Sequence, residues 1–381
     1  MLRWIGCAAG VGILLGTVLS VIGTLVVPRG IDSVITRACD RAVDLWFALM
    51  TKPIRGFARR DRTLAWQAPV GLLLRLAVWI CLLVLGYALL LLPAVAGQPW
   101  HAFSEAGSSM FTLGYAAPTN SSSTMIDYVA AYTGLVVVGL QIGYLPTLYA
   151  AFNRRETEVT LLISRAGVPA WGPEILARTK WGIYGGDTGP ALGELFERWE
   201  RWSAEVAESH TTYLTLTRLR SPRPLSHWLT SLLAVMDSAA LHLALAPNSE
   251  PKVQARLCLR MGFTALRQIA ATMRLPVQED PDPDDPLMLT YQQFSAAVEM
   301  LRDVKYPIEV PTEQAWSDFR GWRINYEATA YALTRMLDAP PAPWSGPRRW
   351  PSQPINPIRP ANGRPPDAGP PDAGGATSIS R

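Results

Sequence analysis

The chain lacks the residue patterns of most catalytic and cofactor-binding sites. Its four cysteines and four histidines have no metal-ligand spacing, and the cysteines predict no disulfide framework. The Gly-rich stretch 184–190 is not followed by Gly-Lys-Ser/Thr, and no Gly-x-Gly-x-x-Gly motif occurs, so no nucleotide-binding loop is indicated. The acidic stretch 280–286 contains prolines and no closing glutamate, which argues against a calcium-binding EF-hand. We therefore expect no enzyme activity, no cofactor and no structural metal.

Three long segments have almost no charged residues. Trp4–Val27 and Tyr128–Phe152 contain no Lys, Arg, Asp or Glu, and Ala68–Val95 contains only Arg75. Because about 20 mostly apolar residues cross a bilayer as a helix, we predict three transmembrane helices. The first belongs to an N-terminal segment, 1–29. The net charge of +4 is too small to indicate a nucleic-acid partner, and the expected surroundings are a lipid bilayer.

Lys and Arg are absent from residues 97–127 but abundant in the first loop. Residues 28–67 hold eight of them: Arg29, Arg37, Arg41, Lys52, Arg55, Arg59, Arg60 and Arg62. Since loops rich in Lys and Arg stay on the cytoplasmic side, we expect a multi-pass protein of the cytoplasmic membrane. Its N-terminus would be outside and its C-terminal region in the cytoplasm. Residues 1–23 also fit a cleaved signal peptide, although no clear Ala-x-Ala site follows.

The segment 30–67 is predicted to be a basic amphipathic linker. Apolar side chains recur in it at helical spacing: Ile31, Val34, Ile35, Ala38, Ala42, Leu45, Trp46 and Leu49. Such a helix fits the membrane interface, and it fits equally well a connector packed on the C-terminal domain. In the first and third spans, Gly12 with Gly16 and Gly139 with Gly143 form small-xxx-small pairs, which let membrane helices approach closely.

The remainder of the chain reads as a helical domain, 153–339, followed by a tail, 340–381. Helical patterns cover 192–206, 225–245, 253–274, 287–304 and 313–337, and Pro-containing breakers separate them. No strand-like alternation occurs in this region. The tail is rich in proline and glycine, and we expect it to be disordered because it has too little apolar surface to bury. The predicted fold class is an all-α membrane protein with a cytosolic helical domain.

The segment Phe103–Pro118 lies between the second and third spans and is too short and polar to cross a membrane. This layout predicts a re-entrant loop within a helix–loop–helix unit, 68–152. Ala102–Phe111 would be a short pore helix, whose C-terminal end carries a partial negative charge that favours a cation. The extended segment after it would present backbone carbonyls, which can replace the hydration shell of a cation.

The order Thr-Leu-Gly-Tyr-Ala at 112–116 resembles the Thr-Val-Gly-Tyr-Gly filter of potassium channels. Residues 25–29 and 141–156 also resemble segments of bacterial potassium-channel-family proteins of the two-pore-domain-like kind, with one pore loop per chain. The resemblance implies a homotetramer that conducts K⁺ or another monovalent cation and is modulated by its cytosolic domain. It implies that the cation would bind to backbone carbonyls of Thr112, Leu113, Gly114, Tyr115 and Ala116.

Two features qualify this function. Potassium filters end Gly-Tyr-Gly followed by Asp, whereas Ala116 and Ala117 stand at the last two positions here. Weaker ion selectivity is expected, and an alternative is a non-conducting membrane anchor or sensor that keeps the pore fold. In the third span, Gly139, Gly143 and Pro146 are the candidate gate hinge, because proline removes a helix hydrogen bond and glycine adds flexibility.

Overall fold

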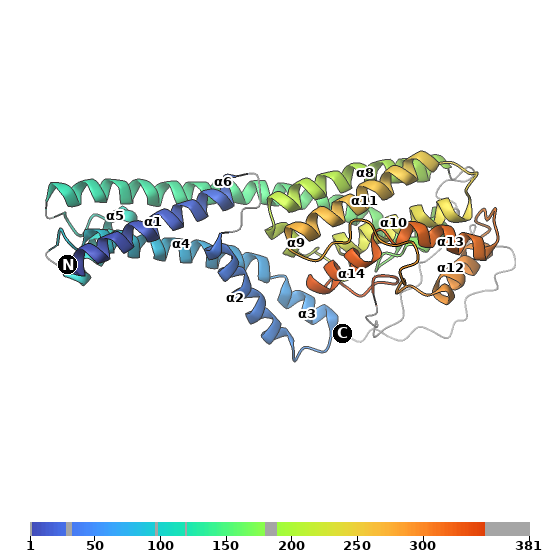
Figure 1. Ribbon diagram of the computed structural model, residues 1–381, viewed down its shortest axis with the longest axis horizontal. Helices are drawn as coiled ribbons and strands as arrows, with labels where there is room; N and C mark the ends of the chain where they lie inside the picture. The colour runs from blue at the N-terminus through green and yellow to red at the C-terminus, as the bar shows by residue number, and fades with distance from the viewer. Residues whose placement is uncertain (1, 28–32, 96–97, 119, 180–188, 347–381) are drawn as a thin grey trace. The chain divides into compact units, whose positions relative to one another are not determined.

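The computed structural model describes residues 2–27, 33–95, 98–118, 120–179 and 189–346 (Figure 1). Over these ranges the regular structure is entirely helical and no strand occurs, so the predicted all-α class is confirmed. The contacts divide the chain into two compact units. Unit 1 contains Met1–Thr157, Glu205–Pro224 and Ala271–Arg274, and unit 2 contains the intervening segments and the chain from Leu275 onward. The contiguous division at residue 153 that the sequence suggested is therefore too simple.

Unit 1 is built from long apolar helices and several short ones. Its elements are α1 (Leu2–Leu25), α2 (Val34–Thr51), α3 (Phe57–Leu64), α4 (Gln67–Leu91), α5 (Pro99–Met110), the first part of α6 (Ser121–Ala166) and α9 (Thr215–Arg218). α4 packs against α1, α2 and α5, so it is the central helix of this unit. The ends of α8 (Gly189–Thr212) and α11 (Lys252–Thr272) also belong to unit 1.

Within the part of the chain that the structure describes, four helical stretches are long and apolar enough to cross a membrane: Arg3–Leu25, Phe57–Leu91, Ser121–Ala166 and Trp228–Leu245. The first three overlap with the spans predicted from sequence, and the first two end at Leu25 and Leu91, before the predicted ends at Val27 and Val95. The fourth is α10 (Trp228–Leu245) of unit 2, and every one of its residues is buried in the protein. A helix that is apolar on all sides and fully covered by protein is a core helix, because it has no face left for lipid.

The close contact between α1 and α4 does not use the glycine pair predicted for α1. A Cβ atom added at Gly10 would lie 2.7 Å from the backbone oxygen of Gly86, and one added at Gly86 would lie 2.8 Å from Leu14. Gly12 and Gly16 instead face open space, with no atom within 4 Å of such a Cβ. The helix backbones therefore meet at Gly10 and Gly86, as expected where small residues allow close packing.

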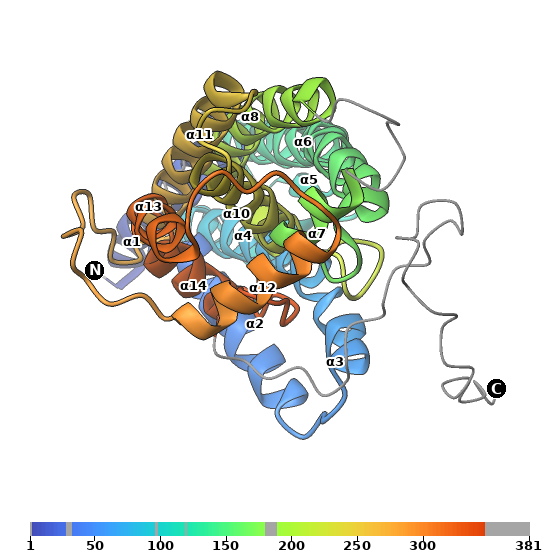
Figure 2. The same cartoon turned by 90° about the vertical axis from the view of Figure 1, so that its right-hand side faces the viewer.

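Unit 2 is organised around α10 (Figure 2). α7 (Gly172–Arg178), α13 (Thr312–Arg323) and α14 (Glu327–Met336) pack against it, and α12 (Tyr291–Asp303) packs against α7 and α13. The predicted helix 313–337 is thus two helices, separated at Ile324–Tyr326. Tyr326 is almost fully buried, and its hydroxyl donates to Asp237 of α10 at 2.8 Å. The break allows this side chain to reach the core.

A buried arginine, Arg323, joins the C-terminal segment to the core of unit 2. Its guanidinium donates to Asp237, to Glu327 at 2.9 Å and to the backbone oxygen of Trp344 at 2.7 Å. Trp344 is 7% exposed. Residues 340–346 are therefore packed, and the predicted start of a disordered tail at Pro340 is wrong for them. Residues 347–381 of that predicted tail lie outside the described residues.

A pair of truncations tests the role of this segment. We expect a chain ending at Asp338 to lose about 3 kcal/mol or more of stability, because it loses a buried Trp and leaves an Arg323 donor without its acceptor. A chain ending at Gly346 keeps both and should unfold like the full chain. Thermal unfolding of the three purified proteins in one detergent measures the difference. Equal midpoints for the two truncations would contradict the role assigned to Trp344.

Candidate functional site

The predicted pore helix corresponds to α5, which spans Pro99–Met110 instead of Ala102–Phe111. Pro99 occupies its first turn, where the missing N–H has no intrahelical partner to lose, and this explains the earlier start. Ala102, Ala106 and Met110 lie on its buried face and join the apolar core of unit 1. This face packs against α4 (Figure 1). The position of α5 is therefore fixed by its apolar side, as expected for a short helix next to a long one.

The five predicted filter residues form one short loop directly after α5. The amide of Leu113 donates to the oxygen of Ser108 at 2.8 Å, which turns the chain sharply at the helix end. The amide of Ala116 donates to the Ser108 hydroxyl at 3.1 Å. Ser108 is itself buried, so it ties the far end of the loop to α5. The side chains of Leu113 and Tyr115 are exposed within the single chain.

Two residues of this loop have left-handed backbone angles. Gly114 has φ of 72°, a conformation that glycine adopts without steric cost. Ala116, which stands where potassium filters have a second glycine, does not have a positive φ. Instead Thr112, at φ 56°, is the one loop residue other than glycine with positive φ among those described. A left-handed angle costs a residue with a Cβ roughly 1–2 kcal/mol, so the strain of this loop is at Thr112.

Behind the loop, α6 approaches α5 at a glycine that the sequence analysis did not select. A Cβ atom added at Gly134 would lie 2.3 Å from the backbone oxygen of Met110, closer than any real contact of this kind. At the candidate hinge glycines, Gly139 and Gly143, no atom lies within 4 Å of such a Cβ. α6 continues as one helix through Pro146. The role of these three residues as a gate stays a prediction.

Two buried acidic side chains also lie behind the loop, and they too were missed. Glu105 of α5 is fully buried and Asp127 of α6 is 8% exposed. His101 lies 3.5 Å from Glu105. Glu105 and Asp127 are the only charged residues between 97 and 127, so the signal was visible in the sequence. Ionisable groups within a membrane segment are costly and usually have a function.

The later part of α6 is held by a buried arginine, Arg155. It donates to the backbone oxygens of Leu216 and Leu219, at 2.7 Å each, and pairs with Glu156 at 2.7 Å. His210 of α8 lies 3.0 Å away through Nε2. Burial, and then the positive charge of Arg155, hold the pKa of His210 well below its usual range. His210 is therefore neutral and accepts a hydrogen bond from Arg155.

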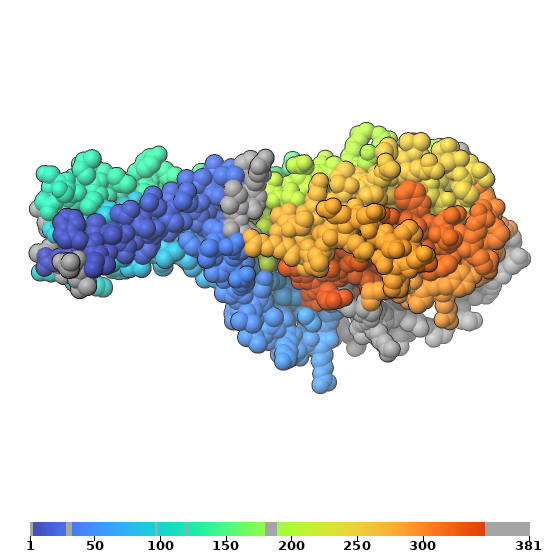
Figure 3. Space-filling view, viewed as in Figure 1, coloured from blue at the N-terminus to red at the C-terminus, as the bar shows by residue number. Residues whose placement is uncertain are grey.

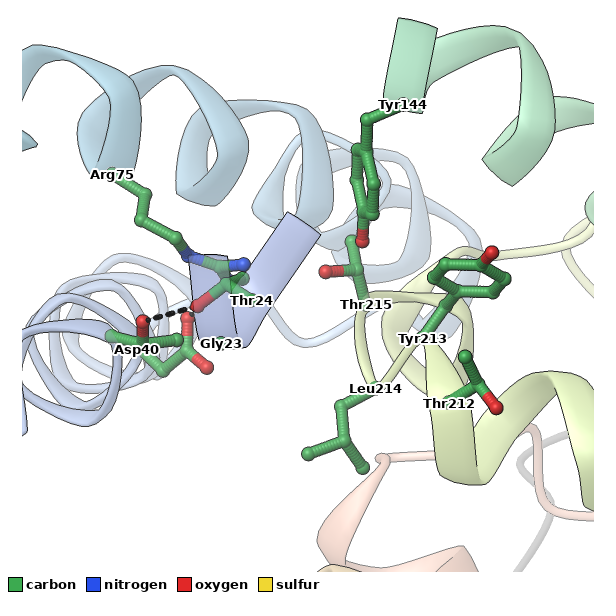
Figure 4. Close-up of a pocket in the computed structure, with 10 residues that line it drawn as sticks. Gly23, Thr24, Asp40, Arg75, Tyr144, Thr212, Tyr213, Leu214 and Thr215 are labelled. Carbon is green, nitrogen blue, oxygen red and sulfur yellow. Dashed lines mark hydrogen bonds and ion pairs between the residues drawn. The ribbon is translucent and has the colours of Figure 1, made fainter. Parts of the chain in front are cut away.

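The same part of unit 1 contains a small polar cavity of about 20 Å³. Arg75 and Asp40 pair beside it at 2.8 Å, and Tyr144 and Tyr213 meet edge to face at 5.6 Å (Figure 4). A cavity of this size holds about one water molecule. The cavity is too small for a ligand, but it brings residues of α4, α2, α6 and the α8–α9 segment together.

Comparison of the chain with protein-family models, with curated proteins and with solved structures finds no match.

The contact between Gly134 and Met110 can be tested with a matched pair of variants. Gly134→Ala forces α5 and α6 apart and should cost about 1–3 kcal/mol, because the atom in the way is a backbone oxygen. Gly139→Ala, in the same helix, adds the same methyl group in open space and should be neutral or slightly stabilising. Thermal midpoints in detergent compare the two. A Gly134→Ala protein as stable as Gly139→Ala would show that the helices do not meet there.

Because His210 is buried and its pKa is lowered, we predict that its contact with Arg155 of α6 is sensitive to acid. Its pKa is lower in the folded than in the unfolded chain, so the unfolded state binds more protons below pH ~6.5. Stability from this group is complete above that pH and is lost as the pH falls, by up to about 1.4 kcal/mol per unit. Hydrogen exchange of residues 205–220 should therefore accelerate between about pH 6.5 and 5, after correction for intrinsic rates.

His210→Gln should remove this dependence, whereas His242→Gln in unit 2 should leave it intact. His242 is a suitable control because burial lowers its pKa as well. An unchanged pH dependence in His210→Gln would assign the acid sensitivity to another group.

Proposed function

We propose that this chain is one subunit of a potassium-channel-like protein that conducts monovalent cations across the cytoplasmic membrane. The observation that carries the proposal is α5 and its loop. With 12 residues, α5 is about 18 Å long, too short to cross an apolar layer of about 30 Å. It lies between two helices that are long enough, α4 and α6. A short helix followed by irregular backbone at membrane depth fits a loop that lines a water-filled path.

Several features of the loop suit cation binding. Its residues are anchored to α5 by Ser108, which leaves the remaining backbone oxygens available, and Gly114 has the left-handed angle that a carbonyl-lined turn needs. In this proposal the ions are coordinated by the carbonyls of residues 112–116. The exposed side chains of Leu113 and Tyr115 would contact neighbouring copies.

A single loop cannot surround an ion, so four copies would be needed to close a ring of carbonyls. The exposed apolar face of α6 supports such an assembly. Tyr128, Tyr132, Leu135 and Ile142 are each more than half exposed within one chain. We therefore propose a homotetramer in which these side chains meet other copies or lipid.

The orientation proposed from sequence puts the loop outside and unit 2 in the cytoplasm. The absence of Lys and Arg from 97–127 and their abundance in α2 and α3 support it. Arg155 then lies just beyond the cytoplasmic end of the third span, where it binds the α9 segment. A movement of that segment would reach α6 below the candidate hinge of Gly139, Gly143 and Pro146. This contact is the proposed route by which the cytosolic part modulates the pore.

Two observations favour the alternative, a non-conducting anchor or sensor. Thr112 has a strained backbone angle, and Ala116 and Ala117 stand where potassium filters have glycine and aspartate. An alanine resists the left-handed angle that glycine adopts freely, and without the aspartate the mouth of the filter has one less negative charge per chain.

Flux measurements in liposomes test the proposal. Gly114→Val should abolish potassium flux, because a β-branched residue resists the left-handed angle by more than 1 kcal/mol per chain. Nothing lies within 4 Å of a Cβ at this position, so the effect would be one of backbone conformation, not of packing. Ala116→Gly should keep the flux and sharpen the preference for potassium over sodium in bi-ionic reversal potentials.

Two outcomes would count against conduction through this loop. A Gly114→Val protein that conducts like wild type would mean that another path carries the ions. No flux in wild type or in Ala116→Gly, with both proteins correctly folded in the liposomes, would favour the anchor or sensor.

A further inference from the structure

The hairpin formed by α2 and α3 has an unusual balance of charges. Residues 34–66 contain seven basic and three acidic side chains. Each acid pairs with an arginine from outside the hairpin: Asp40 with Arg75 at 2.8 Å, Asp44 with Arg218 at 2.8 Å, and Asp61 with Arg220. The acids are therefore used to attach the hairpin to the rest of unit 1. Among the described contacts, six hairpin cations have no ion pair: Arg37, Arg41, Lys52, Arg55, Arg59 and Arg62.

The apolar side chains of the hairpin divide into two faces. Thr36, Cys39, Val43, Phe47 and Thr51 are buried and form the face that packs on unit 1. The apolar stripe predicted from sequence is largely on the other face. Val34, Leu45, Trp46 and Leu49 are between 50% and 73% exposed, and Met50 is 47% exposed. These side chains of α2 are thus uncovered within the single chain. The hairpin is the blue projection at the lower side of the view in Figure 3.

The position of the hairpin in the chain bears on what covers this face. α3 forms the N-terminal end of the candidate membrane stretch Phe57–Leu91, whose apolar part is α4 from Gln67 onward, and α2 comes directly before it. Trp66, between α3 and α4, is 66% exposed. Trp is enriched at membrane–water interfaces, and amphipathic helices bind there with their apolar face in the acyl boundary and their cations near the headgroups.

We propose that α2 and α3 form a binding surface for anionic lipid headgroups on the cytoplasmic face of the membrane. Leu45, Trp46 and Leu49 enter the interface, and Arg55, Arg59 and Arg62 bind the headgroups. A second copy of the same surface is a poorer occupant, because it carries the same excess of positive charge. The proposal requires that α4 crosses a membrane, and it holds whether or not the pore conducts.

A photo-crosslinker at position 49 reports directly what covers the exposed face. The full chain, with Leu49 replaced by p-benzoylphenylalanine, is reconstituted in vesicles of phosphatidylcholine with about 30% phosphatidylglycerol and irradiated. The mass of the adduct then distinguishes lipid from protein. We expect a lipid adduct in which the ratio of phosphatidylglycerol to phosphatidylcholine is at least about fivefold that of the vesicle, since each Lys or Arg near an anionic surface contributes about a fivefold preference. The same crosslinker at Leu257, exposed on α11 of unit 2, should give no lipid adduct.

Charge-neutralised variants separate the headgroup contribution from the apolar one. Arg55→Gln, Arg59→Gln and Arg62→Gln together should reduce the enrichment of phosphatidylglycerol towards its share of the vesicle. The control is Arg223→Gln, Arg256→Gln and Arg260→Gln, which removes the same charge from three exposed arginines elsewhere and should leave the enrichment unchanged.

Each contrary outcome overturns the proposal. A protein–protein adduct at position 49 would assign the face to another copy or to another part of the chain. Absence of any adduct would mean that water covers it. A lipid adduct with no preference for phosphatidylglycerol, or an equal loss of preference in the control triple, would show that the hairpin cations do not select anionic headgroups.

Discussion

The approach of α6 to the end of α5 is the constraint on which the candidate site depends. Only a residue without a Cβ fits against the Met110 backbone oxygen, so Gly134 determines how closely α6 approaches the last turn of α5. The loop begins there, and Ser108 holds its other end. Side chains that do not take part in any chemistry therefore determine where the backbone oxygens of residues 112–116 are presented.

A second constraint is electrostatic, and it operates at the opposite end of unit 1. The guanidinium of Arg155 is buried beside the neutral imidazole of His210, and it is stable there only because two backbone oxygens and Glu156 accept its hydrogen bonds. Arg218 and Arg220, from the same α9 segment, bind the acids of the α2–α3 hairpin. The segment 205–224 thus contacts both the helix that would line a pore and the hairpin, so the positions of the three are linked.

The sequence was informative where one physical signal dominated. Long uncharged runs predicted the ends of α1 and α4 to within a few residues, whereas α6 extends well beyond the predicted span 128–152, from Ser121 to Ala166. The sequence-based prediction failed where the outcome depends on contacts with residues far away in the chain. Gly12 and Gly139 each have a second glycine four residues further on, which is a spacing typical of packed membrane helices. The neighbouring helices determine which glycines make the close contacts, and these are Gly10 and Gly134. Likewise, the apolar stripe of α2 was correctly found, but the sequence alone does not say whether protein or another medium covers it. From sequence, Trp344 belongs to the predicted tail. Its backbone oxygen accepts a hydrogen bond from Arg323, more than 20 positions earlier in the chain, and no local sequence pattern indicates such a contact.

The two units are not successive domains, because the chain passes between them five times. Residues 205–224 complete unit 1, although the sequence on both sides of them builds unit 2. Neither unit is therefore one continuous stretch of the chain. A cut after residue 157 would leave the N-terminal fragment without residues 205–224 and 271–274 of unit 1, which the C-terminal fragment would retain. The two units are interleaved along the chain, so neither can be exchanged independently by recombination at a single junction.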